Sequence, residues 1–142
     1  MFEKILWATD GSESADRALN YAKVLAKKFD AELIMVHSVE YVIAAPDGEP
    51  AFAEEEEHKV KLRTQASTAQ EEGINVSVVM AGGRQEGAGQ VIADTATEQG
   101  ADLIVVGTRG LSAVAGLLLG SVTQRLLQVA PCPVVAVPPP RA

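Results

Sequence analysis

The most informative residues for a possible binding site are glycines in the last third of the chain, because of their spacing. The apolar run Leu103–Val106 leads to Gly107 and Gly110, and nine residues further on come Gly120 and Ser121. This order predicts a strand, a glycine-bearing loop and a helix. Glycines let the backbone approach a phosphate, and a helix N-terminus offers unpaired N–H groups with a partial positive charge. The spacing therefore indicates a phosphate-binding loop.

The same residues also have plain structural interpretations. Gly107 and Gly110 suit a turn that requires positive φ. Ser121 suits an ordinary helix cap, although its hydroxyl and that of Thr123 could also donate to phosphate oxygens. Arg109, inside the loop, suits either a phosphate partner or a solvated surface residue. Capping and phosphate binding are compatible, so both interpretations stay open.

Several enzyme motifs are missing. The pattern G-x-x-x-x-G-K-[ST], whose Lys grips β- and γ-phosphates, does not occur. The first strand leads into DGSES rather than the G-x-G-x-x-G of a dinucleotide-binding dehydrogenase. No motif places a general base. These residues thus favour the binding of a phosphate group over its chemical conversion.

The elements that must position this loop follow from hydrophobic periodicity. Short β-rich runs alternate with helical patterns along the whole chain. Strands are predicted at residues 2–9, 31–39, 74–80, 103–106 and 134–137, and helices at 15–29, 54–72, 85–99 and from about 121 to 130. This alternation predicts an α/β fold: a five-stranded parallel sheet with helices on both faces. Residues 41–53, with two prolines and a glycine, are predicted to be a loop that covers a site or is disordered.

Composition narrows the class of protein. Hydrophobic residues make up 47% and aromatic residues only 4%, so the core must consist mostly of aliphatic side chains. The net charge of −7 argues against binding nucleic acid or anionic membranes. The 142 residues suit a single domain spanning 1–142, with an ordered core over about 1–138.

The cysteine content and the lengths of the apolar runs bear on where in the cell the protein is found. Its single cysteine, Cys132, cannot form an internal disulfide, which fits a reducing compartment. No signal peptide is recognised, and the apolar run at 113–119 is far shorter than the ~20 residues of a membrane span. We therefore expect a cytoplasmic protein with no membrane partner.

Together, the glycine–serine spacing and the opening ILWATDGSESADRAL resemble the universal stress protein family, in its ATP-binding branch. The resemblance covers nearly the whole chain. It implies a single-domain fold of the adenine nucleotide alpha hydrolase-like, Rossmann-like type with sheet order 3-2-1-4-5. It also implies ATP as cofactor, with Mg²⁺ as its companion. The implied nucleotide-binding residues are Ala8, Asp10, Ser38, Gly107, Thr108, Arg109, Gly110, Gly120, Ser121, Val122 and Thr123.

Within this set the resemblance suggests particular roles. Ala8 would lie under the nucleotide, and the backbone at Ser38 would read the adenine. Asp10 would lie at the nucleotide, although by its residue type it also suits a turn. Arg84 is a weaker phosphate candidate. His37 is predicted to be structural, because no nucleophile accompanies it.

Three functions are compatible with the sequence. We favour a stress-response regulator that acts as an ATP-dependent switch rather than a fast enzyme. One alternative is a slow ATPase or self-phosphorylating protein, modified at Ser121, Thr123 or another hydroxyl near the γ-phosphate. The other is a ligand-free interaction module. The resemblance further implies a homodimer in which the last strands, Val134–Val137, pair antiparallel. No downstream protein partner can be named from the sequence.

Overall fold

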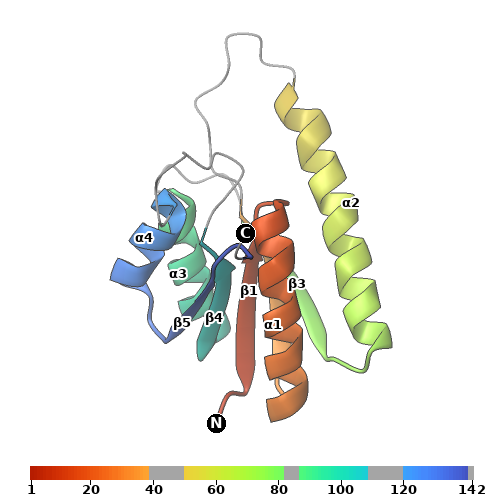
Figure 1. Cartoon of the computed structure of the whole chain (residues 1–142), viewed down its shortest axis with the longest axis vertical. Coiled ribbons are helices and arrows are strands. Elements are labelled where there is room, and N and C mark those ends of the chain that lie inside the picture. The colour runs from red at the N-terminus through yellow and green to blue at the C-terminus, as the bar shows by residue number, and fades with distance from the viewer. Residues whose placement is uncertain (39–49, 82–86, 109–119, 141–142) are drawn as a thin grey trace.

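The computed structural model describes residues 1–38, 50–81, 87–108 and 120–140. Five strands alternate with four helices in this part of the chain (Figure 1). In chain order they are β1 (Lys4–Thr9), α1 (Glu13–Phe29), β2 (Glu32–Ser38), α2 (Pro50–Glu71), β3 (Val76–Ala81), α3 (Ala88–Gln99), β4 (Leu103–Gly107), α4 (Ser121–Val129) and β5 (Val134–Val137).

All five strands belong to one parallel sheet with the order β3-β2-β1-β4-β5. The predicted fold class and strand order are therefore confirmed. The order reverses between β1 and β4, because β2 and β3 extend the sheet to one side and β4 and β5 to the other. Central strands such as β1 are buried on both faces, which explains their nearly unbroken apolar sequences.

Each face of the sheet has its own core. On one face, Ile5 and Trp7 pack with the buried residues of α1 and α2. On the other, Leu6 and Ala8 pack with the buried residues of α3 and α4. Successive side chains of a strand point to opposite faces, so a single strand supplies both cores. The Trp7 indole N–H donates to the Ala15 carbonyl at 2.9 Å and joins β1 to α1.

Several predicted bounds differ from the structure by one or two residues, and two helix starts were wrong by more. Helix α2 begins at Pro50 rather than residue 54, so residues 50–53 are helical and not part of the predicted loop. Proline is favoured in the first turn of a helix, where its missing N–H costs nothing. Helix α3 begins at Ala88 rather than residue 85, because Gly87 has φ +83° and interrupts helical geometry. Residues 41–49, 85 and 86 lie outside the described residues.

Within the described ranges, no helix is both long enough and apolar enough to cross a lipid bilayer.

Candidate functional site

The two central strands separate at their carboxyl ends. The pairing of β1 with β4 ends at Trp7 and Val105, although β1 continues to Thr9 and β4 to Gly107. The pairing of β1 with β2, by contrast, continues to Thr9. The sheet therefore opens between β1 and β4, where the strand order reverses, and open α/β folds bind ligands at such a point.

The turn after β1 satisfies its own polar groups. The Asp10 carboxylate accepts the Ser12 N–H at 2.9 Å, and the Thr9 hydroxyl accepts the Gly11 N–H at 3.0 Å. The Ser12 hydroxyl accepts the Ala15 N–H at 3.2 Å and caps α1. Gly11 has φ +87°, which favours glycine. Asp10 thus performs the turn role, and its half-buried position at the end of β1 places it at the opening between the strands.

The turn after β4 begins with a close contact rather than a strained backbone. Gly107 does not have positive φ, so that expectation was wrong for this glycine. A Cβ on Gly107 would lie 2.8 Å from the carbonyl carbon and oxygen of Ser14 in the first turn of α1. Gly107 is therefore required by the packing of α1 against the end of β4.

Hydrogen bonds join the end of β4 to the start of α4. The Thr123 hydroxyl donates to the Gly107 carbonyl at 2.9 Å. The Gly120 N–H donates to the Thr108 carbonyl at 2.7 Å, and the Thr108 N–H donates to Val137 at 3.1 Å. Thr108 and Gly120 are thus neighbours, although eleven residues of sequence, 109–119, separate them. The Thr123 hydroxyl thus makes its hydrogen bond within the protein, and the Thr123 side chain is buried.

At the turn from β4 to α4, backbone N–H groups and one buried hydroxyl have no side-chain partner among the described residues. Helix α4 has Gly120 as its N-cap and receives no side-chain capping bond within the described part of the chain. The first backbone N–H groups of a helix have no intrahelical acceptor. Beside them lies Thr108, which is only 5% exposed and whose hydroxyl has no hydrogen-bond partner among the described residues. Buried hydroxyls are normally paired, and the described residues supply no partner for that of Thr108.

The remaining predicted residues lie as follows. Ala8 is buried at the end of β1, and the backbone of Ser38 ends β2, beside Ala81 of β3. Ser121 is exposed at the first turn of α4, and Val122 follows it half-buried. Arg109, Gly110 and Arg84 lie outside the described residues.

Two side chains of α2 reach the β1–α1 turn and were missed by sequence reasoning. A Cβ on Gly11 would meet the His58 ring at about 2.5 Å. The Lys61 ammonium donates to the Gly11 carbonyl at 3.1 Å and to the Asp16 carboxylate at 2.6 Å. These contacts join residues about fifty positions apart, and no local pattern in α2 indicated them.

His37 and Cys132 are both withdrawn from solvent, the first buried and the second half-buried. His37 is buried in β2, and its ring centroid lies 6.0 Å from that of His58. Burial, and secondarily the negative charge of Asp102, raise the pKa of the Cys132 thiol. A raised pKa keeps the thiol protonated at neutral pH, and the protonated form is a poor nucleophile.

The parallel sheet and the reversal of its strand order between β1 and β4 define an open α/β protein. Residues 1–138 match the family model of the universal stress protein family, and the chain belongs to that family. The "Universal stress protein in QAH/OAS sulfhydrylase 3'region" of Thermus aquaticus is 41% identical over 146 aligned positions, which cover 96% of this chain and 99% of that protein.

Solved structures are similar over the whole chain as well. Hypothetical protein MJ0577 has a TM-score of 0.85 and 27% identity, with 100% of this chain and 99% of that chain covered. A universal stress protein in complex with cAMP has a TM-score of 0.63 and 28% identity, with 96% of each chain covered. The fold and the family are thus shared with a protein that holds an adenine nucleotide.

Proposed function

We propose that this chain binds an adenine nucleotide, ATP, in the opening between β1 and β4. The observation that carries the proposal concerns two features of one turn that the described residues leave without a partner. They are the N-terminus of α4, which has no side-chain cap, and the buried Thr108 hydroxyl beside it. A phosphate offers several acceptor oxygens to such donors. Membership of the family and the related protein solved with cAMP support an adenine nucleotide as the ligand.

The proposed roles follow from position. Phosphate oxygens accept hydrogen bonds from the backbone N–H groups of residues 121–123, at the helix start that Gly120 caps. They also accept from the hydroxyls of Ser121 and Thr108. Asp10 lies at the end of β1, where it can accept a hydrogen bond from a ribose hydroxyl. Arg109 and Gly110 belong to the same site in this proposal, by their position in the sequence.

The remaining contacts of the proposed site concern the base and a metal ion. Ala8 lies under the nucleotide, and the backbone of Ser38 reads the adenine. Mg²⁺ accompanies ATP by neutralising phosphate charge. We name no catalytic residue, because these groups bind and orient a phosphate chain without supplying a general base.

We also propose that ATP occupancy acts as the regulatory signal, in the cytoplasm. The site joins three parts of the fold: the end of β1, the end of β4 and the start of α4. Lys61 and His58 of α2 contact the β1–α1 turn directly, so a ligand at Asp10 would act on α2 as well. Occupancy can therefore change the surface that a downstream partner meets.

A charge placed at the first residue of α4 tests the nucleotide site. In Ser121→Glu we expect ATP affinity, measured by calorimetric titration with Mg²⁺, to fall by about ten-fold or more, because the carboxylate repels the phosphates. Thermal stability should not fall, since an acidic residue favours a helix N-terminus by about 0.3–1 kcal/mol.

The matched control is Gln128→Glu, which adds the same charge at the exposed far end of α4. It should bind ATP like the parent chain. No heat of binding for the parent chain at millimolar ATP, or equal affinities in both variants, would contradict the proposal.

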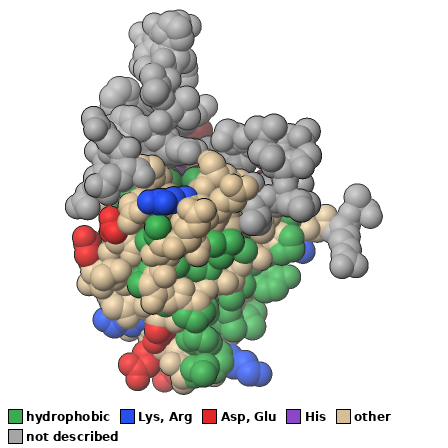
Figure 2. Space-filling model, turned by 90° about the vertical axis from the view of Figure 1, so that its left-hand side faces the viewer, with side chains coloured by type: hydrophobic (Ala, Val, Ile, Leu, Met, Phe, Trp, Pro, Cys, Tyr) green, Lys and Arg blue, Asp and Glu red, His purple; other side chains and the backbone are tan. Residues whose placement is uncertain are grey.

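We further propose a homodimer through β5. The Ile104 N–H donates to Pro133 and the Thr108 N–H to Val137, so the backbone groups of Val134 and Ala136 point away from β4. Hydrophobic side chains gather on the side of the molecule that carries α3, α4 and β5 (Figure 2). An unpaired apolar edge is usually covered, and a second β5 would cover it.

Ala136→Pro tests this dimer. Proline removes an N–H that points outward and spares the bonds to β4. By light scattering we expect the parent chain to be a dimer and the variant a monomer at micromolar concentration. A monomeric parent chain would refute this arrangement.

A further inference from the structure

The other edge of the sheet, β3, is uncharged and open. Its sequence is VSVVMA, with neither a charged residue nor a proline. The Asn75 carbonyl accepts the Leu33 N–H at 2.8 Å, which fixes the alternation along the strand. Val76, Val78 and Met80 therefore turn their N–H and C=O groups away from β2. None of the described residues pairs with them, because β3 ends the sheet.

The side chains on this edge are exposed as well. Val78 is 41% exposed and Met80 is 50% exposed, on the face of the sheet that α2 covers only in part. Proteins usually protect an edge strand with lysines, prolines, bulges or a covering element. Strand β3 carries no lysine or proline and α2 covers it only in part, so its sequence is typical of an edge that pairs with another strand.

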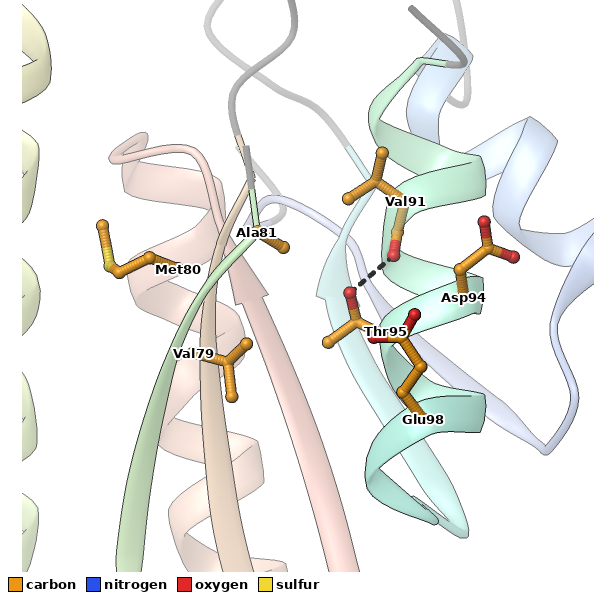
Figure 3. Close-up of a pocket in the computed structure, with 7 residues that line it drawn as sticks. All are labelled: Val79, Met80, Ala81, Val91, Asp94, Thr95 and Glu98. Carbon is orange, nitrogen blue, oxygen red and sulfur yellow. Dashed lines mark hydrogen bonds between the residues drawn. The ribbon is translucent and has the colours of Figure 1, made fainter. Parts of the chain in front are cut away.

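On the opposite face, β3 borders a cavity of about 160 Å³. Val79 and Ala81 of β3 face α3 across it, and Val91 lies on the helix side (Figure 3). Helix α3 also contributes two carboxylates to the lining, Asp94 and Glu98. Among the described residues that line the cavity, none is basic. The cavity thus combines aliphatic walls with an acidic side.

A strand added beside β3 would meet both features. Alternate side chains would lie next to Val78 and Met80, and the others would lie over the cavity. Lys and Arg suit the cavity positions, because their aliphatic stems can cover Val79 while the charged head reaches Glu98. Apolar residues suit the positions beside Val78 and Met80.

We propose that the outer edge of β3 and this cavity bind an extended segment of a partner protein in which apolar residues alternate with Lys or Arg. The segment adds a sixth strand to the sheet through main-chain hydrogen bonds, and its basic side chains pair with Asp94 and Glu98. This mode of recognition is β-strand addition. The site is separate from the proposed nucleotide site and does not depend on it. A second copy of this chain fits less well, because β3 has no basic residue to offer.

The test uses a fluorescently labelled heptapeptide in which Val and Lys alternate, titrated with the full chain and followed by anisotropy. A peptide with Glu in place of Lys and a scrambled peptide of the same composition serve as controls. We expect the alternating Val–Lys peptide to bind at least about ten-fold more tightly than either control, because only it offers both the strand register and the opposite charge.

Amide exchange measured by NMR locates the binding. On addition of the Val–Lys peptide, the N–H groups of Val78 and Met80 should become protected. Those of Ser77 and Val79 should change little, because they already donate to β2. This alternation is specific to strand addition, and non-specific charge attraction would not produce it.

Two variants complete the test. Val78→Pro removes an outward N–H and leaves the β2 pairing intact, so it should abolish peptide binding in a folded chain. Asp94→Lys with Glu98→Lys should weaken binding of the Lys peptide about ten-fold and favour the Glu peptide instead. Circular dichroism checks the fold of both.

Several results would overturn the proposal. Equal affinity for the alternating and scrambled peptides would show that the peptide is held by charge attraction alone and not by strand pairing. Unchanged binding in Val78→Pro would place the peptide elsewhere. Concentration-dependent self-association that Val78→Pro removes would identify a second copy of this chain as the occupant instead.

Discussion

Two turns meet at the opening in the sheet, and they differ in how far the protein satisfies them. The β1–α1 turn is complete: Thr9, Asp10 and Ser12 each accept a backbone N–H, and α1 is capped. The β4–α4 turn is incomplete in the described part of the chain. There α4 has no side-chain cap, and the Thr108 hydroxyl is buried without a partner.

This difference separates structural residues from candidate ligand-binding residues. A satisfied group loses a hydrogen bond when it is changed, so its substitution should lower stability. An unsatisfied buried group costs free energy in the empty protein and gains a partner only on binding, so its substitution should lower affinity and spare stability. Four substitutions, at Gly107, Thr123, Ser12 and Thr108, test this contrast, and their expected effect on stability decreases in that order.

Gly107→Ala should be the most damaging change. Its Cβ would lie 2.8 Å from backbone atoms of Ser14, which cannot rotate away, so β4 and α1 must separate. We expect a loss of about 2–3 kcal/mol of unfolding free energy, measured by urea denaturation. Gly73→Ala is the control: its Cβ meets nothing within 4 Å and only its φ of +88° is unfavourable, at about 1 kcal/mol. Equal losses of unfolding free energy in the two variants would show that the contact with Ser14 adds nothing to the cost of a side chain at Gly107.

Thr123→Val should cost about 1–2 kcal/mol of unfolding free energy, because it removes the donor to the Gly107 carbonyl while keeping the side-chain shape. Thr95→Val is a matched control. The Thr95 hydroxyl donates to Val91 within α3, a carbonyl that the helix itself already satisfies, so little should be lost. Urea denaturation of both variants makes the comparison, and a stable Thr123→Val would count against a structural role for this hydroxyl.

Ser12→Ala should cost about 1 kcal/mol of unfolding free energy, since α1 loses its side-chain cap. Ser12→Asp keeps an acceptor and should restore stability. Thermal unfolding measures both. A fall in stability that Asp does not rescue would mean that the serine acts through packing instead of capping.

Thr108→Val should leave unfolding free energy unchanged to within about 0.5 kcal/mol, because the hydroxyl has no partner among the described residues. ATP affinity should fall about five-fold by calorimetry, which corresponds to one lost hydrogen bond. The contrast with Thr123→Val is the sharpest test of the two turns. A destabilised Thr108→Val with unchanged ATP affinity would reverse their assignment.

The sequence by itself determined the strands and their parallel direction, whereas their order, and with it the edge at which the candidate site lies, was implied by the resemblance to the family. Apolar periodicity and the punctuation by glycine and proline act locally, so they are visible without a structure. Strand β5 was predicted at its observed bounds for this reason. The start of α2 was missed because a proline inside a polar loop resembles a proline in the first turn of a helix.

Only the tertiary structure decided what each polar group at the site does. Gly107 looked like a turn glycine, yet it is there because α1 packs on it. Thr108 and Thr123 look alike in the sequence, but among the described residues only Thr123 has a carbonyl within reach. The contact of His58 with Gly11 joins separate elements in the same way. Such pairings depend on which backbone segments come within 3 Å of each other, and local residue patterns carry no information about that distance.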